Sequence, residues 1–227
     1  MDTVVLDNEV VLLLHGLGRS VRSMHRMERA LIQHGYRVQN IAYQSRKKPI
    51  EQLAVDAIGT ALQNQQGAAK IHFVTHSLGG ILVRQYLAHH QIANLGRVVM
   101  LGPPNQGTEI VDKLGQFPGF RWMNGDAGIQ LGTLASSLPN QLGGADFDVG
   151  IIAGTRSVNL ILSALIPGRN DGKVAVEKTK LPGMRDHLEM AVTHPFMMRN
   201  KRVIEQVICY LQSGGFHRRP SRQALSR

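Results

Sequence analysis

The 227-residue sequence contains a single cysteine, Cys209, so it cannot form an internal disulfide. Aromatic residues make up only 5% of the chain, and they do not alternate with basic residues as in a groove that binds single-stranded nucleic acid. Every apolar run is shorter than the roughly 20 residues that cross a bilayer. The ten histidines show no H-E-x-x-H or comparable spacing, so their pattern predicts no metal site.

Acidic residues are also scarce: the sequence has 16 aspartates and glutamates and 26 lysines and arginines, which gives a formal net charge of +10. Such a charge favours weak attraction to anionic surfaces. The basic residues are nevertheless scattered, with small clusters at 46–48 and 218–219, and this pattern favours a solvated face over a specific nucleic-acid site. Residues 214–227 carry four arginines and little that could pack, so we expect a basic, mobile tail.

Targeting signals are absent as well. The chain starts Met1-Asp2-Thr3, without a basic segment, and the apolar run 10–14 is too short for a signal-peptide core. We therefore expect a cytoplasmic protein. Its length and its 43% hydrophobic content fit a single domain over residues 1–213.

Apolar segments alternate with helical patterns, as in a doubly wound α/β sheet that is mostly parallel. Strands are expected at 9–14, 37–43, 70–76, 97–102, 148–154, 174–177 and 189–193. A stripe of helical period begins at Ile50. The last helix is expected to begin at Pro195, with Phe196 among its inward residues and Cys209 at the margin of that face.

The most informative stretch is 74–80, Val-Thr-His-Ser-Leu-Gly-Gly, which places Ser77 between a predicted strand and a predicted helix. A strand that turns sharply into a helix strains its corner residue, and small neighbours let the two arms pass. The corner hydroxyl is then exposed at a helix N-terminus. The usual pattern is G-x-S-x-G, and Thr75 replaces its first glycine. The alternative is an ordinary strand-to-helix turn, but the flanking segments favour a nucleophile elbow.

A second apolar strand ends in His15-Gly16-Leu17-Gly18. In a serine hydrolase such a loop faces the nucleophile, so we assign the oxyanion hole to the N–H groups of Leu17 and Leu78. The alternative, a phosphate-binding loop, lacks both the G-x-x-x-x-G-K-[ST] and the G-x-G-x-x-G patterns.

A nucleophilic serine needs a base and an orienting acid, which follow it in the order Ser, Asp, His in α/β-hydrolases. Asp171 stands in the polar turn Asn170-Asp171-Gly172, and His194 precedes the last predicted helix. His187 and Asp186 are the rival base and acid, but they come before the short apolar run 190–192 rather than after it. Asp146 and Asp148 likewise precede their strand. His15 and His76 are interpreted as structural, with His76 pointing away from the site.

These segments, His15-Gly16-Leu17-Gly18, Thr75-His76-Ser77-Leu78-Gly79-Gly80, Asn170-Asp171-Gly172 and Thr193-His194, resemble the α/β-hydrolase superfamily, specifically its compact bacterial lipase and esterase branch. The resemblance extends from about Val10 to Leu211. It implies a triad of Ser77, Asp171 and His194 that cleaves a small-molecule or lipid carboxylic ester through an acyl-enzyme. It also implies no metal and no organic cofactor.

Residues 105–147 interrupt the alternation and are rich in Gly, Pro and Asn. Long insertions in compact domains are usually functional, so this segment is a candidate lid or cap. Phe117, Phe120 and Trp122 are then the candidate residues of a substrate pocket. The alternative is a surface excursion that covers the edge of the sheet.

Two other functions remain open at this stage. A thioesterase or an acyltransferase would use the same triad with a different leaving group or acceptor. A non-catalytic binding protein could use the same scaffold, because a fold does not determine a function.

Overall fold

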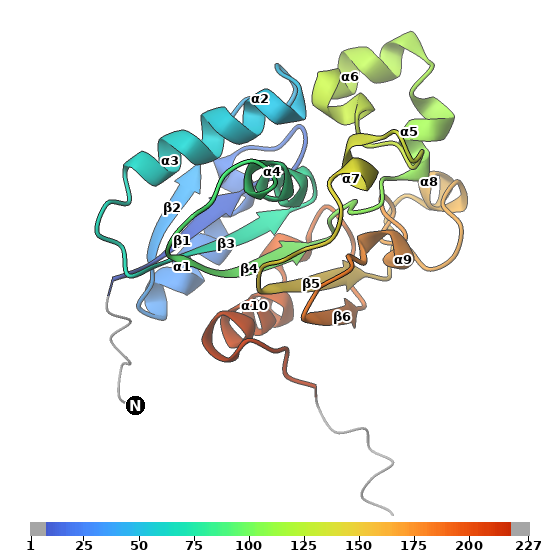
Figure 1. The fold of residues 1–227 in the computed structure, drawn as a ribbon. Helices are drawn as coiled ribbons and strands as arrows, with labels where there is room; N and C mark the ends of the chain where they lie inside the picture. The colour runs from blue at the N-terminus through green and yellow to red at the C-terminus, as the bar shows by residue number, and fades with distance from the viewer. Residues whose placement is uncertain (1–7, 219–227) are drawn as a thin grey trace, which may run out of the picture.

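One six-stranded sheet forms the centre of the computed structural model, which describes residues 8–218 (Figure 1). Its strands are β1 (Glu9–Leu14), β2 (Arg37–Ile41), β3 (Lys70–His76), β4 (Leu95–Leu101), β5 (Val149–Gly154) and β6 (Asp186–Met190). Their spatial order is β2-β1-β3-β4-β5-β6, and every neighbouring pair is parallel. The order reverses between β1 and β3, and crevices at such reversals bind ligands in α/β sheets.

Helices cover both faces of this sheet because its strands are apolar on both sides. In β1, Val10, Leu12 and Leu14 pack into the core cluster beneath α2 (Ile50–Ala54) and α4 (Leu78–Leu87). Val11 and Leu13 point to the other face, where they join side chains of α1 (His25–Gln33) and α10 (Lys201–Ser213). Figure 1 shows these two layers on opposite sides of the strands. The alternation follows from the two-residue period of a strand.

The remaining helices are short except α6, which is interrupted by a non-helical residue, Gly125. They are α3 (Thr60–Gln63), α5 (Glu109–Leu114), α6 (Pro118–Ile129), α7 (Leu138–Gln141), α8 (Leu160–Ala164) and α9 (Val176–Thr179). A π-helical segment, Val55–Gly59, joins α2 to α3, and single 3₁₀ turns lie at Val21–Ser23 and Met197–Arg199. Between residues 8 and 218, no helix combines the length and apolar character needed to cross a membrane.

The segment 105–147 contains the short helices α5, α6 and α7, which lie beyond the carboxyl ends of the strands (Figure 1). Arg84 of α4 connects it to the sheet layer. The guanidinium is 4% exposed and donates to the carbonyl oxygens of Asn105, Pro139 and Gly143, at 2.8, 2.9 and 2.7 Å. Burial lowers the pKa of Arg84 to about 10, so the group stays charged at neutral pH. This buried cation satisfies three carbonyls that would otherwise lack donors.

Three sequence predictions about secondary structure are wrong in detail. Residues 174–177 form no strand: Ala175 makes only an isolated bridge to Asn170, and α9 follows. The last strand spans 186–190 rather than 189–193. The last helix begins at Lys201 rather than Pro195, because the Asn200 side chain accepts from the N–H groups of Arg202 and Val203 and caps it there.

Two side chains near the C-terminus also differ from expectation. Phe196, expected inside the last helix, is 55% exposed because the chain is still in a turn at that point. Phe216 lies in the predicted tail but is 7% exposed and packs on Tyr210, with ring centroids 4.8 Å apart. Arg218 donates to the Asp186 carboxylate. The predicted tail therefore packs through residue 218, and residues 219–227 lie outside the described residues.

Candidate active site

Ser77 occupies a sharp turn between β3 and α4, as predicted for the corner of an elbow. Its φ of 53° and ψ of −119° lie in a region that residues with a Cβ rarely adopt. Two hydrogen bonds hold the turn: the Ser77 N–H donates to Leu101 O at 2.9 Å, and the Gly80 N–H donates to Ser77 O at 3.0 Å. The strained residue is therefore fixed by the end of β4 on one side and by its own helix on the other.

Glycines around the turn allow a close approach that any side chain would block. A Cβ at Gly79 would lie 2.7 Å from Leu14 O, so the first turn of α4 could not pack on the end of β1. A Cβ at Gly16 would lie 2.8 Å from His76 Nδ1. Thr75 can stand where the pattern usually has glycine because residue 80 is itself a glycine: a Cβ at Gly80 would lie only 3.3 Å from Thr75 Oγ1. The second glycine after Ser77 leaves room for the Thr75 side chain.

Asp171 and His194 form a buried pair. Asp171 Oδ2 lies 2.7 Å from His194 Nδ1, and the two residues are 1% and 4% exposed. The other carboxylate oxygen, Oδ1, accepts from the N–H groups of Lys173 and Val174 at 3.0 and 2.9 Å. A carboxylate only accepts, so the contact places the His194 proton on Nδ1 and leaves Nε2 as an acceptor.

The turn that carries Asp171 is fixed by its neighbour Asn170. The Asn170 Oδ1 atom accepts from the Gly172 N–H at 3.0 Å and from Ser163 Oγ at 2.7 Å, while Nδ2 donates to Gly168 O at 3.0 Å. Gly172 has a φ of 93°, which favours glycine. The Asn-Asp-Gly sequence thus aims the aspartate through local hydrogen bonds.

Two glycines beneath the Asp171–His194 pair were missed by the sequence analysis. Gly102, with a φ of 54°, follows β4, and a Cβ there would lie 3.0 Å from Asp171 Oδ2 and 3.2 Å from His194 Nδ1. A Cβ at Gly154, at the end of β5, would lie 2.8 Å from Asp171 Cβ. Neither belongs to a motif. The only available signal was a glycine at the carboxyl end of a predicted strand, where βα loops carry functional groups.

The loop after β1 presents the predicted oxyanion donors. Within residues 8–218, neither the Leu17 N–H nor the Leu78 N–H makes a hydrogen bond, so both remain free to donate. Ser45 Oγ accepts from the Gly18 N–H at 2.9 Å, and the Tyr43 hydroxyl donates to His15 O. His15 stacks on Tyr43 with centroids 4.1 Å apart and is 1% exposed, in agreement with its predicted structural role. Burial lowers the pKa of His15.

His76 does not point away from the site as the sequence analysis proposed. Its ring centroid lies 4.7 Å from that of His194, and its Nε2 atom donates to His194 O at 3.0 Å. Burial lowers the pKa of His76 well below its usual value, and the neighbouring His194 ring and the positive charges of Arg19 and Lys173 lower it further. We interpret His76 as a neutral imidazole that holds the backbone of the His194 loop.

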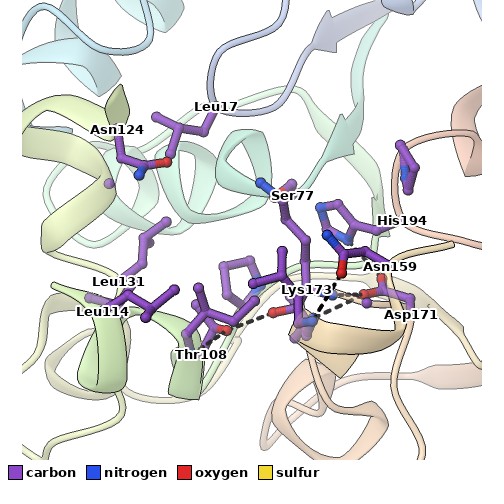
Figure 2. Close-up of a pocket in the computed structure, with 18 of the residues that line it drawn as sticks. Leu17, Ser77, Thr108, Leu114, Asn124, Leu131, Asn159, Asp171, Lys173 and His194 are labelled. Atoms are coloured by element: carbon purple, nitrogen blue, oxygen red, sulfur yellow. Dashed lines mark hydrogen bonds and ion pairs between the residues drawn. The ribbon is translucent and has the colours of Figure 1, made fainter. Parts of the chain in front are cut away.

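A cavity of about 280 Å³ contains Ser77, Asp171 and His194 in its wall (Figure 2). Much of the wall is apolar and comes from Leu17, α5, α6 and α8, with Ile110, Leu114, Phe120, Leu131 and Leu162 among its residues. Of the three predicted pocket residues only Phe120 lines this cavity. Phe117 and Trp122 are 61% and 88% exposed and face solvent instead. Phe117 precedes α6 as its N-cap residue, with an extended backbone, and Trp122 lies two residues after Phe120, on the opposite side of the helix.

The rival base and acid lie elsewhere. His187 is inside β6, and its Nε2 atom is 2.9 Å from Thr179 Oγ1 rather than in the cavity wall. Asp186 begins β6 and accepts from the Phe216 N–H at 2.8 Å. Asp148, just before β5, accepts from the Tyr210 hydroxyl at 2.6 Å. Both carboxylates therefore sit at the amino ends of their strands, whereas Ser77 follows the carboxyl end of β3.

Comparisons with known proteins identify the fold of the chain. No protein-family model matches the chain, and no curated protein matches its sequence. The solved structures that resemble it include lipase BlEst2 from Bacillus licheniformis, esterase RhEst1 from Rhodococcus sp. and phospholipase PlaB from Legionella pneumophila. Their identities are 18%, 17% and 18%, and their TM-scores are 0.69, 0.57 and 0.56. The matches cover 88%, 92% and 76% of this chain and 91%, 92% and 45% of theirs.

These likenesses and the parallel sheet show that the chain has the α/β-hydrolase fold. The sequence prediction of the fold class is confirmed. At such low identity the likeness extends to architecture, and the chemistry has to be argued from the site itself.

The buried, neutral state of His76 predicts how stability depends on pH. Below pH 6.5 the unfolded chain binds a proton at this histidine, whereas the folded chain does not, so the free energy of unfolding falls as pH falls. Between pH 7.5 and 5.5 one such group contributes about 1.4 kcal/mol. Urea unfolding of His76→Gln should show a pH-dependent loss smaller by about that amount than wild type.

His25→Gln is the matched control, because His25 is 53% exposed at its side chain. An unchanged pH dependence in His76→Gln would show that His76 is not held neutral.

Proposed function

We propose that the chain is a serine hydrolase of carboxylic esters, an esterase or lipase, in which Ser77 is the nucleophile. One observation carries the proposal: the buried Asp171–His194 pair, with 2.7 Å between its Oδ2 and Nδ1 atoms, lines the same cavity as a serine on a strained turn. A structural role would not require a serine hydroxyl, a histidine and a buried carboxylate around one cavity. Two of the similar structures, a lipase and an esterase, agree with this chemistry.

In the proposed reaction, His194 Nε2 accepts the proton of Ser77 Oγ as that oxygen attacks the ester carbonyl. Asp171 holds His194 in the required tautomer and stabilises the imidazolium that forms. The Leu17 and Leu78 N–H groups donate to the oxyanion of the tetrahedral intermediate. His194 then protonates the leaving alcohol, and water activated by the same histidine releases the acid.

The apolar wall is proposed to hold the acyl group. At about 280 Å³ the cavity falls near the lower end of the range for small-molecule sites, roughly 300–1,000 Å³. Its size favours a short or intermediate acyl chain over a long one. Because no cofactor is needed for this reaction, a chromogenic ester is a sufficient first substrate.

Ser77→Ala is expected to abolish cleavage of p-nitrophenyl butyrate without unfolding the protein. In a serine protease, loss of the nucleophile lowers kcat by about 10⁶-fold. Wild-type protein mixed with substrate in excess should release p-nitrophenol with a stopped-flow burst if deacylation is slow, and the variant should show no burst. Ser213→Ala is the control, since Ser213 lies at the end of α10, away from the cavity. Retention of more than a few per cent of kcat would exclude Ser77.

His194→Ala should lower kcat nearly as far as Ser77→Ala, because a base must be within hydrogen-bond reach of the hydroxyl. The matched control is His187→Ala, whose side chain contacts Thr179 rather than the cavity. We expect His187→Ala to keep most of the wild-type activity in steady-state assays. The reverse ranking of the two variants would mean that the acid and base lie on β6 and not on the loops that carry Asp171 and His194.

Phe120→Ala should weaken the preference for intermediate acyl chains over acetate. Each buried methylene contributes about 0.8 kcal/mol, or nearly fourfold in kcat/KM, and removal of part of the wall forfeits a share of this gain. The ratio of kcat/KM for hexanoate to acetate esters should fall by about tenfold. Phe117→Ala removes the same side chain from an exposed position three residues earlier. If both variants change the ratio equally, the cavity is not the acyl site.

A further inference from the structure

Two cationic side chains line the cavity that contains Ser77. Arg19 follows the loop that carries Leu17, and Lys173 lies two residues after Asp171. In Figure 2 the Lys173 side chain extends from the Asp171 turn toward Ser77. Both residues are exposed, so a molecule that enters the cavity can reach them. The proposed reaction uses neither charge.

Neither cation has an anionic partner in the described part of the chain. Among residues 8–218, no carboxylate lies within salt-bridge distance of Arg19 or Lys173, although nine pairs between a lysine or arginine and a carboxylate form elsewhere. The carboxylate nearest in sequence to Lys173, that of Asp171, already accepts from His194 Nδ1 and from two backbone N–H groups. The need to balance the Asp171 carboxylate therefore does not explain why both Arg19 and Lys173 lie beside this cavity.

The two charges also act on each other and on the centre of the site. Packing around the Lys173 ammonium lowers its pKa, and the positive charge of Arg19 lowers it further, whereas Asp171 raises it. Both cations also lower the pKa of His76, which directly precedes Ser77. Two like charges beside one cavity repel each other unless an anion lies between them. An incoming anion would remove this repulsion and gain charge-assisted hydrogen bonds.

From this arrangement we propose that Arg19 and Lys173 select an anionic ester, one that carries a carboxylate or phosphate group besides its scissile bond. The proposal rests on the proposed function and names the class of substrate for that site. The apolar wall binds the hydrocarbon part, and the cationic pair binds the charged group. The net charge of +10 acts in the same direction, because it raises the local concentration of anions.

Matched esters test the proposal, because they differ only in the charged group. One pair carries the charge on the alcohol side: 1-hexanoylglycerol and 1-hexanoylglycerol 3-phosphate, assayed by release of hexanoic acid. The other carries it on the acyl side: p-nitrophenyl hexanoate and mono-p-nitrophenyl adipate. We expect kcat/KM to be at least tenfold higher for the anionic member of one pair. This advantage should shrink as NaCl rises from 0.02 to 0.5 M, because salt screens exposed charges.

The Arg19→Gln/Lys173→Gln variant should lower the anionic-to-neutral ratio of kcat/KM by about tenfold in the pair that shows the preference. Because this ratio compares two esters on the same variant, damage that affects both esters equally does not change it. If the double variant does not fold, the single variant Arg19→Gln is measured in its place. Arg29→Gln/Lys201→Gln is the matched control. It removes the same total charge from the exposed surface of α1 and α10 and should keep the wild-type ratio.

Binding to the Ser77→Ala protein separates this proposal from the proposed function. Isothermal titration calorimetry should show 1-hexanoylglycerol 3-phosphate binding more tightly than 1-hexanoylglycerol, with the difference lost in Ser77→Ala/Arg19→Gln/Lys173→Gln. Cleavage of the neutral esters without any anionic preference would overturn the cationic selection and leave the esterase standing. Anionic binding without cleavage of any ester would overturn the esterase but keep the anion site. An equal effect of the control variant would assign the preference to net charge and overturn the local site.

Discussion

The backbone strain at Ser77 is the constraint on which the rest of the site depends. A φ of 53° at a residue with a Cβ costs on the order of 1–3 kcal/mol and persists only where the surroundings hold it. Here the surroundings are the end of β4, through the hydrogen bond to Leu101 O, and the end of β1, against which Gly79 packs without a side chain. Gly16, Gly79 and Gly80 therefore contribute to the backbone packing that presents the Ser77 hydroxyl.

Parallel strands bring the other components to the same edge. Ser77 follows β3, the loop with Leu17 follows β1, and Asp171 follows β5 after an intervening helix. His194 comes only four residues after the end of β6. Because the carboxyl ends of parallel strands lie together, residues separated by more than a hundred positions meet around one cavity. Gly102 and Gly154 keep the ends of β4 and β5 free of side chains at the place where the Asp171–His194 pair packs.

The fold was predictable because its signals are local. Buried parallel strands are apolar runs, and those at 9–14 and 70–76 have the boundaries that the sequence indicated. Ser77, Asp171 and His194 could be proposed from the sequence because their turns carry residues with special backbone requirements. The errors concern side chains whose direction depends on where a helix begins and how it packs: Phe117 caps α6 from outside it, and Trp122 faces solvent from the side of α6 opposite Phe120. His76 was misjudged because its partner, His194 O, lies 118 residues away.

The cavity wall and the elbow belong to one mechanical unit. Arg84 lies in α4, the helix that Ser77 begins, and its guanidinium donates to three carbonyls of the segment 105–147. Asn105 in turn donates to Thr179 O, and the Thr108 hydroxyl donates to Lys173 O at 2.6 Å, next to the Asp171 turn. Loss of the Arg84 guanidinium would leave three carbonyls of the segment 105–147 without this donor. The segment that forms the apolar wall is thus held by the same helix that presents Ser77 and by the same loop that presents Asp171, so the wall keeps a fixed position relative to these two residues.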